Sequence, residues 1–194
     1  MVNKGTVTAV PAPTRHFAFL LGSARDGGNT ERLARTAAAR LPPGSTSRWI
    51  TLRDLPLPAF DDLRHHGEGT YPPPEGAAAV LLEATLAATD LVIASPLYWY
   101  GVSAPVKLYL DHWTGWMRVP GVDFRARMAG RTMWAVTAYG GDDAGGVEPL
   151  LGTLRYTARY LRMRWGGELV APANRPDDLL PPAALAAGAA RFFR

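Results

Sequence analysis

The segment HFAFLLGSARDGGNTERLA, residues 16–34, decides the fold that we expect for this chain. Its first six residues predict a short buried strand, which ends at Gly22-Ser23. From Thr30 onward, apolar side chains return at spacings of three and four residues. That spacing predicts a helix, which the sequence Pro42-Pro43-Gly44 ends. A glycine-rich turn therefore joins a strand directly to a helix.

Strands and helices alternate through the rest of the chain. We expect four more strands, at 47–52, 91–94, 131–138 and 168–171. We expect four more helices, at 77–88, 103–116 (capped by Ser103), 147–163 and 181–193. This alternation predicts an α/β fold, with a parallel sheet covered by helices on both faces. Residues 1–14 are expected to form a flexible arm, and residues 15–194 a single domain.

Composition excludes several classes of site. The 194 residues include no cysteine, which rules out disulfides, thiolate nucleophiles, iron–sulfur clusters and cysteine-ligated zinc. Lys and Arg exceed Asp and Glu by 21 to 17, a modest excess that attracts anions but does not indicate nucleic acid. No run of about 18 apolar residues indicates a membrane span. We expect a cytoplasmic protein.

The turn at 22–30 has the composition of a phosphate site. Its glycines let the backbone approach a ligand, and the following helix offers free N–H groups with a partial positive charge. The side chains that we expect at the phosphate are Ser23, Arg25, Asn29 and Thr30. The turn matches neither the Walker loop nor the Gly-x-Gly-x-x-Gly fingerprint. The alternative is a flexible turn with a capped helix.

Two further loops follow predicted strands. Residues 95–105 place Tyr98, Trp99 and Tyr100 between a proline and a glycine, which suits a flat aromatic ligand. The alternative is that these rings fill the core or a subunit contact. Residues 139–146 hold four glycines, and the alternative there is a long flexible turn. Because all three loops follow parallel strands, we expect them at one edge of the sheet.

Three motifs then carry a resemblance: GSARDGGNTERLA (22–34), DLVIASPLYWYGVSAPVKLYLDHW (90–113) and GRTMWAVTAYGG (130–141). Over about residues 16–170 the chain resembles the NAD(P)H-dependent FMN reductases of flavodoxin-like fold, a group that includes NAD(P)H:quinone and azo reductases. The resemblance implies a three-layer sandwich with a five-stranded parallel sheet in the order 2-1-3-4-5. It also implies FMN as cofactor, NAD(P)H as electron donor and a homodimer.

The resemblance assigns site residues by motif. It places the FMN phosphate at Ser23, Arg25, Asn29 and Thr30. It places the isoalloxazine ring against Pro96, Leu97, Tyr98, Trp99, Tyr100 and Gly101, with Tyr139, Gly140 and Gly141 at the other edge of the ring. No catalytic side chain and no metal ligand is assigned, since the flavin carries the chemistry.

The implied activity is hydride transfer from NAD(P)H through bound FMN to a small acceptor, in a ping-pong cycle. The acceptor is a quinone, a nitro or azo compound, or free flavin. The alternative is an FMN-binding electron carrier or regulatory flavoprotein without nicotinamide activity. The two differ in whether the ring face is open enough to admit a nicotinamide.

Other features favour ordinary structural roles. His65-His66 lie in the long 53–75 connection, which we interpret as a solvated loop rather than a metal site, or as a lid over the flavin. Arg155, Arg159 and Arg162 form a stripe on the predicted 147–163 helix. Such a stripe is usually a solvated helix face rather than a nucleic-acid contact.

Overall fold

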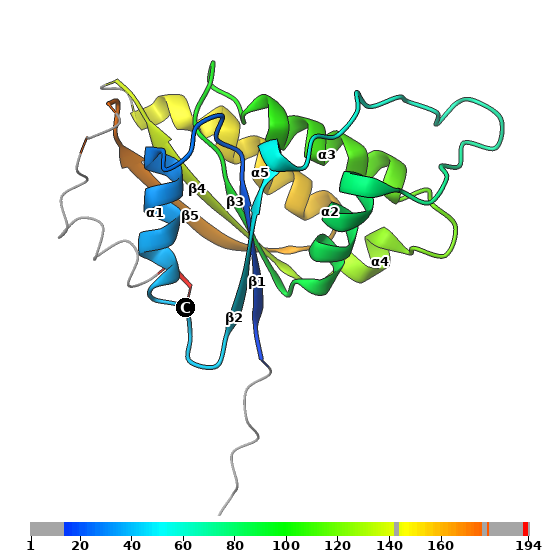
Figure 1. Ribbon diagram of the computed structural model, residues 1–194, viewed down its shortest axis with the longest axis horizontal. Helices are drawn as coiled ribbons and strands as arrows, with labels where there is room; N and C mark the ends of the chain where they lie inside the picture. Colours follow the sequence, from blue (N-terminus) through cyan, green and yellow to red (C-terminus); the bar gives the residue numbers. More distant parts are fainter. Residues whose placement is uncertain (1–13, 142–143, 176–177, 179–191, 194) are drawn as a thin grey trace, which may run out of the picture.

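The fold is a five-stranded parallel sheet in the order β2-β1-β3-β4-β5, seen in a computed structural model (Figure 1). The structure describes residues 14–141, 144–175, 178 and 192–193. The strands are β1 His16–Leu21, β2 Thr46–Thr51, β3 Asp90–Ala94, β4 Thr132–Tyr139 and β5 Arg164–Pro172. The predicted flavodoxin-like strand order is confirmed.

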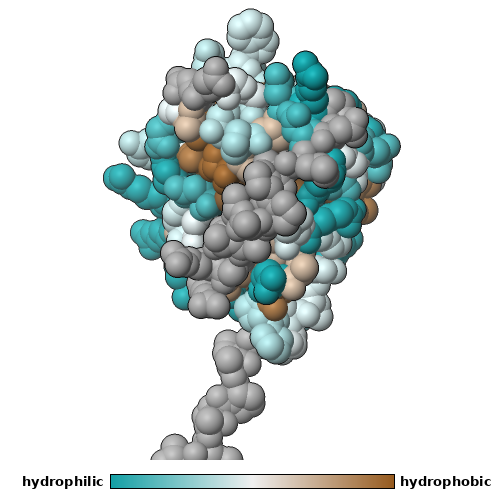
Figure 2. Space-filling view, turned by 90° about the vertical axis from the view of Figure 1, so that its left-hand side faces the viewer, coloured by the Kyte–Doolittle hydropathy of each residue, from teal (hydrophilic) through white to brown (hydrophobic). Residues whose placement is uncertain are grey.

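Helices cover both faces of the sheet. They are α1 Asn29–Ala38, α2 Gly76–Ala87, α3 Ala104–Trp116, α4 Phe124–Met128 and α5 Glu148–Tyr160, with short 3-10 turns η1 Leu52–Asp54 and η2 Ala144–Val147. Figure 1 shows α1 on one side of the sheet and α2, α3 and α5 on the other. The surface on the α1 and β5 side is mostly hydrophilic, with a hydrophobic patch near its middle (Figure 2).

The sheet separates two hydrophobic clusters. Along β1, Phe17 and Phe19 point into the α1 cluster, whereas Ala18 and Leu20 point into the cluster with α2, α3 and α5. This division follows from the alternation of side chains along a strand. All five residues of β3 are buried, as expected of a central strand covered on both faces. The carboxyl edge of this rigid sheet positions the loops described below.

Several predicted boundaries need correction. Helix α1 ends at Ala38, short of the prolines, and α5 begins only after η2 and ends at Tyr160. Strand β5 is longer than the predicted 168–171: polar Arg164 and two glycines near its start hide the apolar pattern of a strand, and β5 pairs with β4 alone. The five-residue helix α4 was not predicted.

Two predicted segments fall mainly outside the described residues. The arm at 1–14 lies outside them except for its last residue, and the helix at 181–193 lies outside them except for Phe192 and Phe193. Both of these phenylalanines are buried in the α1 cluster. Phe193 packs edge-on against Phe17, with ring centroids 5.0 Å apart.

The first part of the long 53–75 connection lies at the carboxyl edge of the sheet, where Arg53 contacts the loop that follows β1, and the lid over the flavin stays a prediction. The later part of the connection packs on the C-terminal half of α3: Tyr71 lies against Gly115, and its N–H donates to the Arg118 carbonyl at 3.3 Å. The ring of Phe60 stacks on Tyr71, with centroids 6.1 Å apart. In Figure 1 the connection projects sideways, away from the loops at the top.

None of the helices in the described part of the chain combines the length and apolar character that crossing a membrane requires.

Candidate functional site

The three loops singled out in the sequence leave the carboxyl ends of β1, β3 and β4, which are neighbours in the sheet. They lie together along the upper edge in Figure 1. This is the edge at which open α/β sheets bind ligands. The prediction that the loops open at one edge is confirmed.

A short hydrogen-bond chain holds the first two loops together. The Gly22 N–H donates to the Ala94 carbonyl at 2.8 Å, and the Ser103 hydroxyl donates to the Gly22 carbonyl at 2.7 Å. The Ser103 N–H in turn donates to Ser95 Oγ at 2.9 Å. A Cβ on residue 22 would lie 2.3 Å from Val106 Cγ2, so only glycine permits this approach.

This arrangement corrects the predicted role of Ser103. The residue occupies the N-cap position of α3, but its hydroxyl makes no capping bond to the helix. It ties the β1–α1 loop to the start of α3 instead. Buried Ser95 and Ser103 therefore hold the first two loops in place next to each other.

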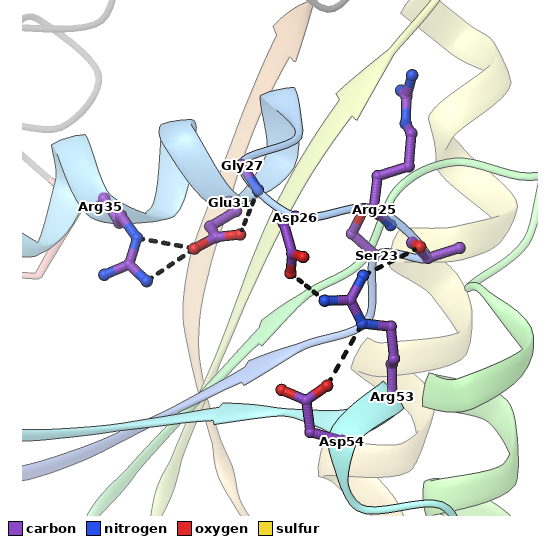
Figure 3. Close-up of polar contacts among 9 residues, drawn as sticks. Ser23, Arg25, Asp26, Gly27, Glu31, Arg35, Arg53 and Asp54 are labelled. Atoms are coloured by element: carbon purple, nitrogen blue, oxygen red, sulfur yellow. Dashed lines mark hydrogen bonds and ion pairs between the residues drawn. The ribbon is translucent and has the colours of Figure 1, made fainter.

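The β1–α1 loop presents donors at an open helix end. The N-cap residue of α1 is Gly28, which has no side chain to cap the helix, so within the described part of the chain the N–H groups of the first turn, from Asn29 on, have no side-chain cap. Ser23 Oγ accepts from the Arg25 N–H at 3.1 Å, which curls the loop toward the helix end. Figure 3 shows the Arg25 side chain extending away from Arg53 and Asp26.

Asn29 and Thr30 are buried and bonded to neighbouring segments. Asn29 Nδ2 donates to the Arg175 carbonyl at 2.8 Å, and Thr30 Oγ1 accepts from the Ala138 N–H at 3.4 Å. Among the described residues, buried Asn29 Oδ1 has no hydrogen-bond partner. Of the four predicted phosphate residues, Ser23, Asn29 and Thr30 therefore surround the start of α1, and Arg25 lies outside at the surface.

Arg53 is a neighbour of this loop that sequence analysis missed. It follows β2, whose carboxyl end lies beside that of β1, and its Nη1 donates to the Ala24 carbonyl at 3.3 Å. It also forms an ion pair with Asp26. The hydrogen bond to Asp26 raises the pKa of Arg53 above its ordinary value. The strand order was the signal that could have located it.

The β3–α3 loop projects its aromatic residues into solvent. Tyr98 and Gly101 exchange backbone hydrogen bonds of 3.2 and 3.0 Å, which closes a two-residue turn. Trp99 and Tyr100 form the tip, with φ of 49° and 63°. These rings are 96% and 61% exposed, so they do not fill the core. Pro96 and Leu97 are half-buried at the base of the loop.

The β4 loop offers backbone rather than an aromatic ring. The Tyr139 side chain is buried in the cluster with α3 and α5, and its carbonyl accepts from the Ala173 N–H at 2.8 Å. Gly140 and Gly141 are exposed beyond it. What faces solvent at this point is therefore the peptide backbone.

The three loops suit a ligand that has a phosphate at one end and a flat ring at the other. An uncapped helix N-terminus beside Ser23 favours an anion, and exposed aromatic rings favour a planar partner. Among the residues that the structure describes, no group of three His, Asp or Glu side chains is placed to hold a metal ion. The orphaned amide oxygen of Asn29 is an acceptor, so it fits a hydrogen-bond donor of the ligand, such as a hydroxyl next to the phosphate.

Comparison with known families agrees with this geometry. Residues 16–173 match the family model described as NADPH-dependent FMN reductase. The chain belongs to this family. The chain is therefore an oxidoreductase, as the motifs predicted. It belongs to the flavodoxin-like enzymes that use a flavin and NAD(P)H.

Members of the family resemble the chain along most of its length. It is 30% identical over 181 residues to YwqN of Bacillus subtilis (strain 168), a protein named for an NAD(P)H-dependent FMN-containing oxidoreductase, and the match covers 92% of this chain and 96% of that protein. It is 36% identical over 111 residues, about half of each chain, to the FMN-dependent NADH:quinone oxidoreductase of Kineococcus radiotolerans.

Solved structures confirm the fold. The Trp repressor binding protein from Bacillus subtilis superposes with a TM-score of 0.72 at 24% identity, covering 92% of this chain and 97% of the other. The apo form of the NADH:FMN oxidoreductase EMOB superposes with a TM-score of 0.63 at 18% identity, covering 93% and 89%.

Proposed function

We propose that the three loops hold FMN and that the chain uses NAD(P)H to reduce a small acceptor at the exposed face of that ring. The acceptor class is a quinone, a nitro or azo compound, or free flavin. The observation that carries the proposal is the pairing, at one sheet edge, of the uncapped α1 N-terminus with the exposed Trp99-Tyr100 turn.

The phosphate end is served by residues of the β1–α1 loop. Ser23 and the N–H groups at Asn29 and Thr30 offer neutral donors at the positive end of the helix. Arg25 is exposed and able to fold inward as a forked cation. These residues would anchor the cofactor without taking part in the chemistry.

The ring end is served by the two other loops. One side of the flavin ring would be lined by the β3–α3 loop, through Pro96, Leu97, Tyr98, Trp99, Tyr100 and Gly101. The exposed backbone of Gly140 and Gly141, next to Tyr139, would meet its other edge. Backbone N–H groups there would stabilise negative charge on a reduced ring.

When bound, FMN would supply hydride transfer, with NAD(P)H and the acceptor using one site in turn, which is a ping-pong cycle. The side chains of the chain need only bind, orient and exclude water. The turn stands out from the surface, with the Trp99 side chain 96% exposed. An open ring face favours an enzyme over an electron carrier.

The test is an anaerobic titration. The purified protein is reconstituted with FMN, freed of unbound flavin by gel filtration, and mixed with NADPH and, separately, NADH. Loss of the yellow absorbance of bound flavin is the expected result. Retained colour with both donors would favour the carrier, and a colourless protein after filtration would contradict the flavin site.

We further propose a homodimer that forms across the groove between α3 and α5. The groove encloses about 720 Å³. Its walls include Lys107, Leu110 and Asp111 from α3 and Tyr156, Arg159 and Tyr160 from α5. Tyr156 and Tyr160 are 70% and 57% exposed, and exposed tyrosines are frequent anchors of interfaces. In a two-fold symmetric dimer the same groove residues of both copies would form the interface.

Light scattering after size exclusion measures the assembly directly. We expect the wild-type chain to have twice the monomer mass and the Tyr156→Glu/Tyr160→Glu variant to be monomeric. Val80→Glu, which changes an exposed apolar residue on α2, is the control and should remain dimeric. A monomeric wild-type chain would contradict the dimer.

A further inference from the structure

The β1–α1 loop contains a carboxylate that works against an anionic ligand. Asp26 lies three residues before the start of α1, and its side chain is 82% exposed. A negative charge near a phosphate dianion weakens binding, and the effect is larger at low ionic strength. A phosphate site in this loop therefore needs a compensating cation.

Arg53 provides that cation from a different element. Its guanidinium forms an ion pair with Asp26 through Nη2, and its Nη1 donates to the Ala24 carbonyl at 3.3 Å. Its Nε faces Asp54 Oδ1 at 3.4 Å (Figure 3). One side chain thus contacts both a charge and a backbone carbonyl of the loop.

The position of Arg53 is set by the sheet. Arg53 belongs to η1, directly after β2, and its neighbour Leu52 is buried in the core. Because β2 pairs with β1 in parallel register up to Leu21 and Thr51, η1 starts beside the phosphate loop. The pairing of β2 with β1 therefore places Arg53 next to this loop.

We propose that Arg53 is a positioning residue of the phosphate site: it cancels the charge of Asp26 and holds residues 24–26, and so gives the site its preference for a phosphorylated flavin. The inference rests on the proposed function, in which the flavin phosphate binds this loop. Arg53 leaves Arg25 free to meet the ligand, since Arg25 forms no salt bridge within the described part of the chain.

A purely structural role of Arg53 predicts a different result, in which the variant binds FMN and riboflavin equally less tightly. Ion pairs on the surface contribute little to stability, so loss of the Arg53 pair should leave the fold intact. The loss of Arg53 changes the net charge next to the proposed phosphate site. FMN and riboflavin share the ring and differ in the phosphate, so their dissociation constants separate the two roles.

The experiment is calorimetric titration of FMN and of riboflavin into the full chain at low salt. For Arg53→Ala we expect the Kd of FMN to rise about fivefold or more, and that of riboflavin to stay within twofold. Arg53→Ala/Asp26→Asn should recover most of the loss, because the uncompensated carboxylate is gone. High salt should shrink the effect of Arg53→Ala.

Arg48→Ala is the matched control. Arg48 lies on β2, the strand that precedes Arg53, and forms an exposed ion pair with Glu83, away from the loop. The control removes the same net charge and should leave both Kd values unchanged.

Each outcome bears on one of the two proposals. If the wild-type chain binds neither flavin, the proposed function and this inference both fail. If it prefers FMN but Arg53→Ala does not reduce that preference, only the role of Arg53 is overturned. Equal weakening of FMN and riboflavin would show a general structural role. A double variant as weak as Arg53→Ala would overturn the charge compensation.

Discussion

At the scale of single residues, the tip of the β3–α3 loop is the clearest departure from what local preference favours. Trp99 and Tyr100 both have positive φ, in a two-residue turn for which Asn-Gly is the favoured sequence. Bulky side chains in this region cost roughly 1–3 kcal/mol each. Such strain is typically found at functional sites, and here it holds two rings in solvent.

Replacing the pair by its favoured turn sequence separates stability from binding. Trp99→Asn/Tyr100→Gly should raise the free energy of unfolding by about 1–2 kcal/mol, since the turn loses its strain. It should also weaken FMN binding, because the aromatic wall is lost. Urea denaturation and flavin titration measure the two effects. The control variant Trp99→Phe/Tyr100→Phe keeps two aromatic rings and the backbone strain, so its stability and its FMN affinity should change less. Unchanged FMN affinity in the Asn-Gly variant would contradict the proposal that these side chains line the flavin ring.

Arg25 is the second position tested at this scale. Arg25→Ala should weaken FMN binding about tenfold, the effect expected of one charge-assisted hydrogen bond. Riboflavin binding and thermal stability should not change, because the side chain is exposed. Equilibrium dialysis with both flavins measures the difference. FMN affinity equal to that of the wild-type chain would remove Arg25 from the phosphate site.

At the scale of elements, strand β5 fits the sheet through a bulge. Met133 pairs with Trp165 and Trp134 with Gly167, so Gly166 is the extra residue. A Cβ on residue 166 would lie 2.4 Å from the Trp134 ring, which is itself buried. The ring cannot retreat, since Phe192 and Phe193 pack edge-on against it.

Gly166→Ala should therefore destabilise the fold by about 2 kcal/mol through overpacking. Gly152→Ala in α5 is the contrasting case, because an added Cβ there meets nothing within 4 Å. That variant should gain up to about 1 kcal/mol from helix propensity. Thermal unfolding monitored by circular dichroism compares them. A Gly166→Ala variant as stable as the wild-type chain would show that the bulge has room.

The strands also show which parts of the fold could be predicted from the sequence. The central strands were located because burial on both faces leaves them wholly apolar, as in β3. Edge strand β5 was underestimated because polar Arg164 and two glycines interrupt that signal. Arg53 was missed because its partner Asp26 is 27 residues away in sequence and only the strand order brings them together. The contacts predicted for the flavin ring came from the family motifs rather than from periodicity, and they stay a prediction.

At the scale of the whole molecule, one buried carboxylate links the two ends of the chain. Asp90 at the start of β3 pairs with Arg15 and accepts from Trp134 Nε1 at 2.9 Å. Arg15 Nη1 also donates to the Phe193 carbonyl at 2.9 Å. Burial raises the pKa of Asp90, but hydrogen bonds from Arg15, Trp134 and Thr89 outweigh it and lower the pKa below its ordinary value.

The lowered pKa sets the pH at which this stabilisation is lost. Since the folded pKa lies below the unfolded value of about 3.9, the contribution is present above pH 4 and disappears as pH falls through the folded pKa. Asp90→Asn should cost about 3 kcal/mol at pH 7, because Arg15 loses its partner. It should also flatten the acid side of the stability curve. Calorimetry from pH 3 to pH 7 measures both; parallel curves would contradict the assignment.

The exposed turn has an optical consequence. Of the six tryptophans in the chain, Trp99 is the fully exposed one, whereas Trp49, Trp113, Trp116, Trp134 and Trp165 are buried or half-buried. Its indole should emit at the red end of the tryptophan spectrum and be open to collisional quenchers such as iodide. A flavin ring beside it would accept its excitation energy and shield it from the quencher. The chain therefore carries its own fluorescent reporter of whether the site is filled.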